Sequence, residues 1–388
     1  MLDLFDHHLE IKPEGAIEAR ALPAHGGVYL VVDADERPVL LASGEDLRRV
    51  VSSRLAGPLP DQRTKRANLA EIAARVHWKE TFSRFETALV HWQAARRLYP
   101  KSYRDLILFS PAWFLRLDLN ARTPAFETVC EFEADGARYF GPVVPRSKAV
   151  EWTRMLEDLF DLCRYRHILE QAPHGQACAY FDMGRCPAPC NGSLSLDEYR
   201  RMLIAAADFT AGAHQPRLEQ LRQAMQAAAA SLAFEKAETI RQISTRAAAM
   251  VQEPEYHHLR ELSRCCWLIV QRAGPRRRSP KNLLVKPFFL RAGAIEAGSP
   301  IPLTELDATV PRWLARCGPC SVLPPASPEE QTARCEILWL VSKFLYQGEQ
   351  APGVFLPFDR LSGASEVIRH VGERCGRPEQ PDTVGQAE

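Results

Sequence analysis

Residues 177–192 have the sequence ACAYFDMGRCPAPCNG, which places cysteines at 178, 186 and 190, and a fourth cysteine precedes them at 163. Four thiolates in so short a stretch can close a tetrahedral zinc site or hold the irons of a cluster. The glycines and prolines between them favour short, stiff loops that direct sulfur atoms toward one centre. Structural zinc sites prefer two close cysteine pairs, and only Cys186 and Cys190 form one, so the spacing favours a cluster over zinc. Unliganded core thiols are the remaining alternative.

On the N-terminal side of this stretch, residues 15–105 have the pattern of a small mixed α/β domain. Apolar runs at 28–32 and 39–42 flank a turn-forming segment and predict a β-hairpin. The polar segment 43–46 predicts the start of an amphipathic helix, and a further helix is expected from Phe82 to Leu98.

Residues 106–195 combine predicted strands with the cysteines. Strands are expected at 106–109, 113–117 and 137–142 because apolar residues there form short runs bounded by turn-forming residues. A helix over 148–162 then leads into the cysteine segment. This part of the chain is therefore predicted to be a strand-rich linker joined to a cysteine cluster domain.

Beyond the cysteines the chain becomes strongly helical and then mixed. Residues 196–252 predict a helical hairpin, because apolar positions recur at helical spacing. Residues 256–375 predict a small α+β unit with paired strands and a long helix, and the polar segment 376–388 predicts a disordered tail. The expected fold class is a multidomain α+β protein: a mixed α/β domain, a cysteine-rich domain, a helical hairpin and a C-terminal α+β unit.

The composition of the 388-residue chain is that of an ordinary globular protein, with 46% hydrophobic and 25% charged residues. No apolar run is long enough to span a membrane, and the acidic, polar N-terminus is unlike a secretory signal, so we expect a cytoplasmic protein. The net charge of +1 argues against a globally basic nucleic-acid coat but not against a local basic face.

The order of these features resembles the N-terminal half of the UvrC family, the nuclease subunit of bacterial nucleotide excision repair, over about residues 22–251. Gly27-Val28-Tyr29 is similar to the first signature of a GIY-YIG nuclease domain, and Tyr139-Phe140-Gly141-Pro142 is similar to a run before the family's cysteines. The segment 178–190 carries the most specific similarity. The resemblance implies a [4Fe–4S] cluster, with zinc as the alternative, on Cys163, Cys178, Cys186 and Cys190.

Residues 232–241 resemble the UVR motif, through which the family contacts the helicase subunit UvrB. The residues themselves agree, because apolar side chains form a narrow seam on two helices that suits pairing with a like hairpin of a partner. The alternative is a hairpin that packs only on the cysteine domain. By resemblance, the expected partner-binding residues are Leu232, Phe234, Glu235, Ala237 and Arg241.

The catalytic residues of a GIY-YIG nuclease are mostly replaced in this sequence. Such a site cleaves a phosphodiester with one metal ion, using a tyrosine, an arginine, a lysine and a metal-binding glutamate. Tyr29 is retained, whereas the other expected positions fall on Leu40, Ser43, Val50 and His91. Valine and serine cannot offset phosphate charge, and imidazole is a poor ligand for Mg²⁺, so Mg²⁺ is expected only if nuclease activity persists.

A shift of register by one or two residues changes this assignment. It would bring Arg48 or Arg49 into the arginine position and Glu86 into the metal-binding position. The family's second nuclease, with an RNase-H-like fold, and its helix-hairpin-helix element are not expected in residues 256–375. Their only aspartates, Asp307 and Asp359, are predicted in loops, and a two-metal centre needs several acids brought together.

Three groups of arginines are candidates for contacts with DNA phosphates, and an ordinary solvated surface is the alternative for each. The groups are Arg48 and Arg49, Arg96 and Arg97, and Arg276, Arg277 and Arg278.

The sequence leads to three hypotheses about function. The leading hypothesis is a UvrC-like repair protein that binds a UvrB-like partner, DNA or both, with GIY-YIG nuclease activity lost or much reduced. The second is an active endonuclease that makes one incision in damaged DNA, so the sequence leaves open whether the chain is an enzyme. The third is an iron–sulfur redox or interaction module outside repair. No membrane association is expected, and the oligomeric state is not determined.

Overall fold

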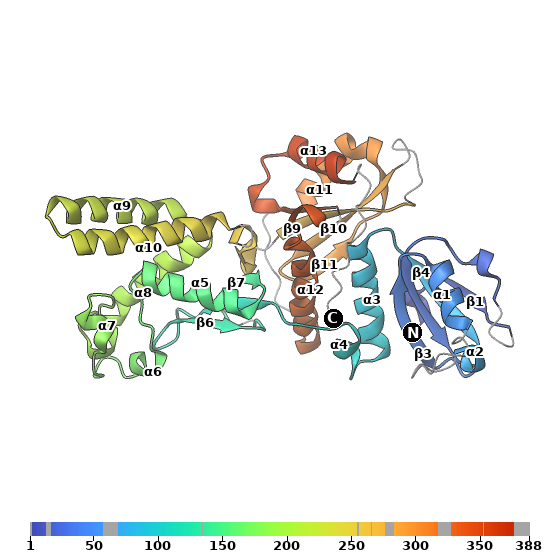
Figure 1. Ribbon diagram of the computed structural model, residues 1–388, viewed down its shortest axis with the longest axis horizontal. Coiled ribbons are helices and arrows are strands. Elements are labelled where there is room, and N and C mark those ends of the chain that lie inside the picture. Colours follow the sequence, from blue (N-terminus) through green and yellow to red (C-terminus); the bar gives the residue numbers. More distant parts are fainter. Residues whose placement is uncertain are drawn as a thin grey trace.

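The computed structural model describes residues 2–12, 17–56, 69–133, 135–253, 256–264, 266–275, 283–316, 327–351 and 353–375. These residues form three antiparallel sheets with helices packed on them (Figure 1). The expected multidomain α+β class is therefore confirmed. The predicted tail at 376–388 lies outside the described residues.

The N-terminal sheet has the strand order β1-β4-β2-β3. Its β2–β3 hairpin is the predicted one, and Tyr29 on β2 lies opposite Ala42 on β3. Helix α1 begins after Asp46, whose carboxylate accepts the Arg49 N–H at 2.9 Å and so caps the helix. The elements are β1 (His7–Glu10), β2 (Gly27–Val32), β3 (Pro38–Gly44), α1 (Leu47–Leu55), α2 (Leu69–Ile72), β4 (Arg75–Glu80) and α3 (Arg84–Leu98).

Every residue of β2 is buried because both faces of this strand are covered. Tyr29 and Val31 face the core beneath α1. The alternate side chains of β2, Val28, Leu30 and Val32, face the core beneath α3. Helices α1 and α3 therefore lie on opposite faces of the sheet.

The second sheet has the order β6-β5-β7-β8 and joins distant parts of the chain. Three of its strands, β5 (Trp113–Leu117), β6 (Phe126–Val129) and β7 (Arg138–Val143), come from the middle of the sequence. The fourth, β8 (Arg260–Glu261), follows the helical hairpin and pairs with β7. Helix α5 (Arg146–Leu159) packs on this sheet.

The predicted strand at 106–109 is wrong. Helix α4 (Tyr103–Leu106) occupies its start, and Leu108 has a left-handed φ of 50° with 82% of its surface exposed, which cannot continue a strand ladder. The run is apolar because Ile107 and Phe109 pack against a core on the C-terminal unit.

The cysteine segment is built from short elements and leads into three long helices. The short ones are α6 (Arg166–Leu169), α7 (Ala179–Asp182) and the 3₁₀ turn η4 (Pro189–Asn191). A capping box between Ser195 and Glu198 starts the first long helix. The long ones are α8 (Leu196–Thr210), α9 (His214–Ala230) and α10 (Phe234–Gln252). The last two pair as a hairpin, whereas α8 lies outside it although the hairpin was predicted over 196–252.

The C-terminal unit is a sheet of order β11-β10-β9-β13 with β12 paired to β10. One face packs on α11 and α13 and the other on α12. Asp307, predicted in a loop, lies in α11, because Leu306, Val310 and Trp313 form a helical apolar face against the sheet. The elements are β9 (Cys266–Arg272), β10 (Leu284–Arg291), β11 (Ala294–Ala297), β12 (Ile301–Pro302), α11 (Leu306–Arg316), α12 (Pro328–Leu345), β13 (Val354–Pro357) and α13 (Ala364–Cys375).

The C-terminal unit lies between the other parts of the elongated molecule (Figure 1). The N-terminal sheet is at one end of the long axis, and α7 with the hairpin is at the other. Helix α3 shares a core with α12, so residues from both ends of the chain pack together. Within the described residues, no helix has the length and apolarity needed to cross a bilayer.

Candidate functional site

The four cysteines lie on the short elements that follow α5. Cys163 comes after the end of α5, Cys178 is the residue before α7, and Cys190 lies inside η4. Cys163, Cys186 and Cys190 are buried, whereas Cys178 is half-buried, and all four are free thiols. The segment therefore holds its cysteines by tight turns rather than by long helices or strands.

The structure brings these cysteines into one neighbourhood. Cys163 and Cys186 influence each other's ionisation: the neighbouring Cys186 thiol, with burial, raises the pKa of Cys163, and Cys163 lowers the pKa of Cys186. The Cys163 thiol donates to the Tyr165 carbonyl at 3.6 Å. Burial raises the pKa of Cys190, and the nearby thiols of Cys186 and Cys178 raise it further. Each of the four is thus close enough to another to affect its ionisation.

The chemistry of the donors is that of a thiolate-bound group, since one segment holds four cysteines and three of them are sheltered from water. The thiols of Cys163 and Cys190 donate to the carbonyls of Tyr165 and Gln176. Within the described ranges, no three histidine, cysteine, aspartate or glutamate side chains are arranged to hold a metal ion.

Asp158 on α5 connects the cysteine segment to the hairpin. Its carboxylate accepts contacts from Arg164 at 2.6 Å, from Arg185 at 3.4 Å and from Arg246 on α10 at 3.2 Å. Arg164 also lies over the ring of Tyr180, 4.3 Å from its centroid. Asp158 thus joins arginines from the cysteine segment and from the hairpin, and the carboxyls of Glu157 and Asp161 also lie near Arg164.

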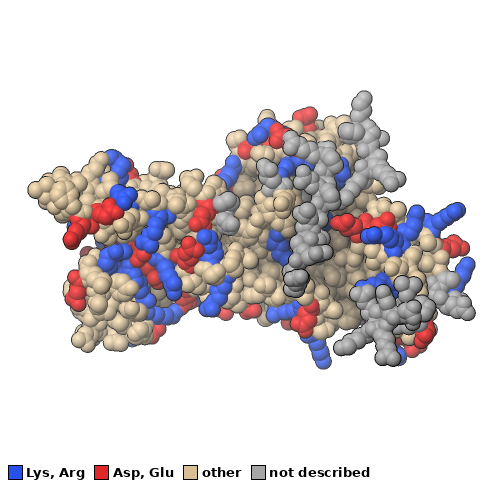
Figure 2. Space-filling view, in the orientation of Figure 1, with Lys and Arg blue, Asp and Glu red and all other residues tan. Residues whose placement is uncertain are grey.

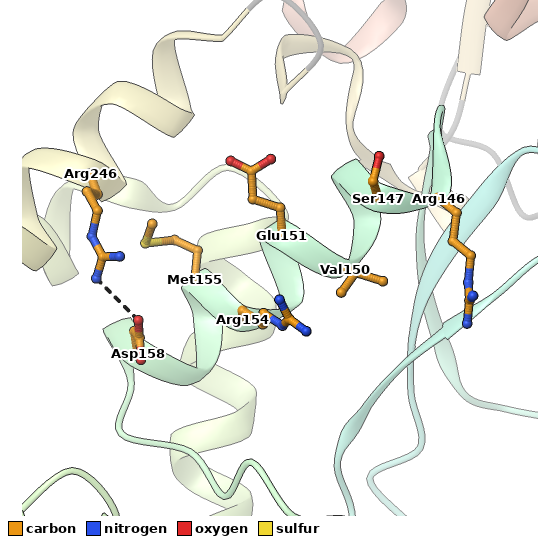
Figure 3. Close-up of a pocket in the computed structure, with 8 residues that line it drawn as sticks. All are labelled: Arg146, Ser147, Val150, Glu151, Arg154, Met155, Asp158 and Arg246. Carbon is orange, nitrogen blue, oxygen red and sulfur yellow. Dashed lines mark hydrogen bonds and ion pairs between the residues drawn. The ribbon is translucent and has the colours of Figure 1, made fainter.

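A pocket of about 650 Å³ opens beside this cluster, between α5 and α10 (Figure 3). Arg146 and Arg154 line it from α5 and Arg246 lines it from α10. Arg154 is exposed and makes no hydrogen bond or ion pair with any described residue. We call this feature the α5–α10 pocket; it is lined by Arg146, Ser147, Val150, Glu151, Arg154, Met155, Asp158 and Arg246.

The sequence analysis missed this group of arginines. Arg146 and Arg154 are eight residues apart on one helix, a spacing near two helical turns that places them on one side. Arg246 joins them only because the hairpin folds back along α5. Figure 2 shows lysine and arginine side chains, mixed with acidic ones, gathered over this part of the molecule.

The α9–α10 hairpin has a packed base and an exposed tip. Near the base, Leu221, Ile243 and Ala247 belong to the core that also holds α5 and α8. At the tip, 73% of the Leu232 surface and 64% of the Phe234 surface are exposed. Two large apolar side chains in water are a surface suited to a partner.

The other predicted partner-binding residues are less available. Glu235 is exposed, but Ala237 is buried in the seam between the two helices. Arg241 is exposed and pairs with Glu238 at 2.7 Å.

The retained Tyr29 lies in an apolar environment rather than a polar cleft. It is fully buried, in the same cluster as Leu40 and Val50, two of the residues that replace family side chains. Burial raises the pKa of Tyr29, while the nearby Arg54 lowers it. Ser43 lies on β3 opposite Val28 and is exposed. The region therefore has the composition of a core.

Glu86, the alternative metal-binding residue on α3, does not lie on the same side of the sheet as Tyr29. Glu86 is buried, with its carboxylate 2.7 Å from the Lys286 ammonium on β10. His91 is half-buried, and burial lowers its pKa. Both residues belong to α3, which covers the face of the sheet opposite to Tyr29.

The arginines predicted to contact DNA have different positions. The Arg48 guanidinium donates to the carbonyls of Leu22 and Arg20, whereas the Arg49 side chain is exposed. Arg96 and Arg97 contact the Glu329 carbonyl and the Asp3 carboxylate. Arg276, Arg277 and Arg278 lie outside the described residues.

Comparison with known proteins gives matches in the middle of the chain. Residues 112–209 match the UvrC/Cho excinuclease middle domain. The UvrABC system protein C of Trichlorobacter lovleyi is 29% identical over 218 residues, which cover 56% of this chain and 36% of that protein. The protein of the same name from Geotalea daltonii is 27% identical over 57% of this chain and 35% of its own length. No solved structure matches the chain significantly.

These matches identify a domain similar to the UvrC/Cho excinuclease middle domain, and in the structure a helical hairpin follows it. The chain spans little more than a third of the length of the curated relatives it matches. The similarity to these UvrABC system proteins C is therefore partial and centres on residues 112–209.

Proposed function

We propose that this chain is a binding component of nucleotide excision repair that contacts a UvrB-like protein and DNA and has little nuclease activity of its own. The observation that carries the proposal is the exposed apolar tip of the hairpin, Leu232 and Phe234. The packed base of the hairpin presents this tip at the end of a rigid element, which reduces the ordering cost of binding.

The partner contact is tested with a UvrB-like protein and the full chain. Phe234→Ala removes a large exposed ring, and we expect it to weaken binding at least about tenfold, as for an aromatic anchor. Gln226→Ala, at an exposed position of α9, is the matched control and should leave binding unchanged. Equal affinities of the two variants, measured by calorimetry, would refute the partner role of the tip.

DNA binding is proposed for the α5–α10 pocket, because Arg146, Arg154 and Arg246 are spread along its lining and the Arg154 side chain makes no ion pair with a described residue (Figure 3). Neutralising phosphates releases counterions, so affinity should fall steeply with salt. Arg154→Gln should weaken binding to all sequences alike and reduce the salt slope by about one. Arg369→Gln, an exposed arginine of α13, is the control. A slope unaffected by Arg154→Gln would remove this pocket from the interface.

A [4Fe–4S] cluster is proposed on the four neighbouring cysteines, with zinc as the alternative. Such a cluster would tie the turns between α5 and α8 together through Fe–S bonds. Protein purified without oxygen should contain iron and sulfide, and Cys190→Ala should lose both. Cys335→Ala, a buried cysteine of α12, should keep them. If the wild-type protein contains zinc and no sulfide, the four cysteines form a zinc site instead.

Reduced nuclease activity is proposed because the surroundings of Tyr29 are apolar apart from the neighbouring Arg54, and because Glu86 is paired with Lys286. The loss of one donor for phosphate charge typically lowers the rate about 100–1,000-fold. A nicked or damaged duplex incubated with Mg²⁺ or Mn²⁺, alone and with UvrA and UvrB, should stay uncut. Incision that Tyr29→Phe abolishes would instead identify an active endonuclease.

A further inference from the structure

A second cavity, of about 240 Å³, lies where three parts of the chain meet. The turn between α8 and α9 forms one wall, and the segment from Tyr256 to Arg260 forms another. The third wall is the 3₁₀ turn η10 (Phe358–Arg360) of the C-terminal unit. Among the described residues, this junction cavity has no lining residue in common with the α5–α10 pocket.

Buried hydrogen-bond donors line the junction cavity. Arg260 is only 4% exposed, and its Nε is 2.9 Å from the Asp359 carboxylate. Its Nη1 donates to the carbonyls of His257 and Leu259, both at 2.7 Å. Its Nη2 has no partner among the described residues. Arg260 therefore satisfies two of its three nitrogens within the described part of the protein, and the third is buried without a partner there.

Two further polar atoms have no partner in the described part of the chain. They are the hydroxyl of Tyr256, whose side chain is 3% exposed, and Nε2 of His214. Buried polar groups in native proteins are nearly always hydrogen-bonded, because an unpaired one costs about 1–3 kcal/mol. Three such atoms on residues that line one small cavity indicate a polar ligand.

The charge of the cavity is positive. Arg260 and Arg360 line it, and Asp359 is the only carboxylate among its described lining residues. Arg360 also lies 3.3 Å from Nδ1 of His257, an exposed neighbour. Burial lowers the pKa of His214, and the positive charges of Arg360, His257 and Arg260 lower it further. A negative ligand would relieve this repulsion.

The helix ends at the cavity favour the same sign of charge. Helix α9 begins at His214, and its N-cap residue Ala213 provides no side-chain hydrogen bond. The dipole at this N-terminus attracts anions, although the His214 N–H already donates to the Gly212 carbonyl and Pro216 has no N–H, so Gln215 provides the N–H within these first three residues. The opposing C-terminal carbonyls of α8 are already occupied, since the N–H groups of Ala211, Gly212 and Ala213 bond to them.

We propose that the junction cavity binds one phosphate-type oxyanion, held by Arg260 Nη2, the Tyr256 hydroxyl, Arg360 and the start of α9. A fully ionised oxyanion only accepts hydrogen bonds, and the free groups named here donate them. The cavity is smaller than the roughly 300–1,000 Å³ of sites for drug-sized ligands, so it suits a single phosphate group rather than a whole nucleotide. The phosphate belongs either to free inorganic phosphate or to the end of a DNA strand.

The test uses the full chain and radiolabelled inorganic phosphate in equilibrium dialysis at constant ionic strength. Tyr256→Phe removes only a hydroxyl that has no partner among the described residues, so it should fold as the wild type does. We expect this variant to raise Kd about five- to tenfold. Arg360→Gln, at an exposed side chain, should have a similar effect, whereas the control Arg369→Gln should stay within about twofold.

Competition distinguishes the two sources of the phosphate. A 5′-phosphorylated oligonucleotide that displaces the label, where the same oligonucleotide with a 5′-hydroxyl does not, identifies a DNA end. Equal failure of both oligonucleotides, with saturable phosphate binding, identifies free phosphate. Wild-type protein without saturable binding, or variants and control with the same Kd, would overturn the proposal. These results do not depend on the hairpin tip or on UvrB.

Discussion

Glu86 would have to bind the metal ion if α3 contributed to a nuclease site. Its contacts instead assign it a structural role. Its side chain is 8% exposed and its carboxylate is 2.7 Å from the Lys286 ammonium. Lys286 lies on β10, 200 residues further along the chain. A buried carboxylate already paired with a lysine has little affinity left for a metal ion.

The Glu86–Lys286 pair predicts a specific pattern of stabilities. Glu86→Ala leaves a lysine in a half-buried position without its partner, and the free energy of unfolding should fall by about 3 kcal/mol. Adding Lys286→Met should recover part of the loss. Urea titrations of the single and double variants measure both values. A loss below about 1 kcal/mol would mean that water solvates the pair and that Glu86 remains available.

His258 is a second residue whose environment determines a measurable property. Its ring contacts those of Trp267 and Tyr346. Burial, assisted by Arg260, His257 and Arg360, lowers the pKa of His258 to about 4. The native protein therefore excludes a proton that the unfolded chain binds below its ordinary histidine pKa, about 6.5.

This difference makes stability depend on pH with a definite sign. The contribution of His258 is fully present above about pH 6.5 and is lost as the pH falls toward 4. Between pH 7 and pH 5 the loss should be about 1–2 kcal/mol. His258→Phe, which keeps a ring, should reduce that loss, and the exposed His174→Phe should not. Free energies of unfolding at the two pH values provide the comparison, and an unchanged pH dependence in His258→Phe would contradict the assignment.

At the scale of elements, the hairpin turn is shaped for exposure rather than for stability. Leu232 has a left-handed φ of 60°, a conformation that costs a residue other than glycine about 1–2 kcal/mol. Its side chain is 73% exposed and gains little from packing. A strained, exposed leucine in a turn between two well-formed helices favours a binding role for that side chain.

The variant Leu232→Gly separates the effect of this residue on stability from its effect on partner binding. Glycine adopts the left-handed turn without strain but has more freedom in the unfolded chain, so the free energy of unfolding should stay level or rise by up to about 1 kcal/mol. Binding to a UvrB-like partner should weaken at the same time. Thermal unfolding and calorimetry on one preparation measure both. A variant that is clearly less stable would show that Leu232 serves the fold.

At the scale of the whole molecule, the N-terminal domain and the C-terminal unit share one core. Phe85, Leu89 and Trp92 of α3 pack with α12 and with the sheet of the C-terminal unit. Glu336 of α12 is 1% exposed at the centre of this contact. It accepts hydrogen bonds from Trp92 at 2.9 Å, from Tyr103 at 2.5 Å and from Arg104 at 2.9 Å.

Removal of Glu336 should therefore weaken both parts of the molecule together. Glu336→Ala leaves the buried donors of Trp92 and Tyr103, and the exposed Arg104, without this acceptor, and we expect a loss of about 3–5 kcal/mol with a single, earlier unfolding transition. Glu329→Ala, an exposed residue at the start of α12, should cost less than about 1 kcal/mol. Calorimetric scans in which only one of two transitions moves would argue against a shared core.

Local patterns predicted the elements that depend on neighbouring residues. The β2–β3 hairpin, helices α1 and α3 and the α9–α10 hairpin follow from periodicity and capping signals, and these act over a few residues. The run at 106–109 was misjudged because its apolar residues pack on a distant core instead of on a strand neighbour. Asp307 was misjudged although Leu306, Val310 and Trp313 recur at helical spacing, a signal in the sequence that predicts helix α11.

The candidate functional sites also fall into two groups, those predicted from local sequence and those formed only by tertiary contacts. The cysteine segment and the exposed hairpin tip could be predicted from residue spacing and family resemblance, since their residues are close in the sequence. The pairing of Glu86 with Lys286, the arginines of the α5–α10 pocket and the donors of the junction cavity join residues from about 80 to 200 positions apart. No periodic pattern carries such a pairing, because it exists only after the chain has returned from the hairpin and packed its C-terminal unit against α3.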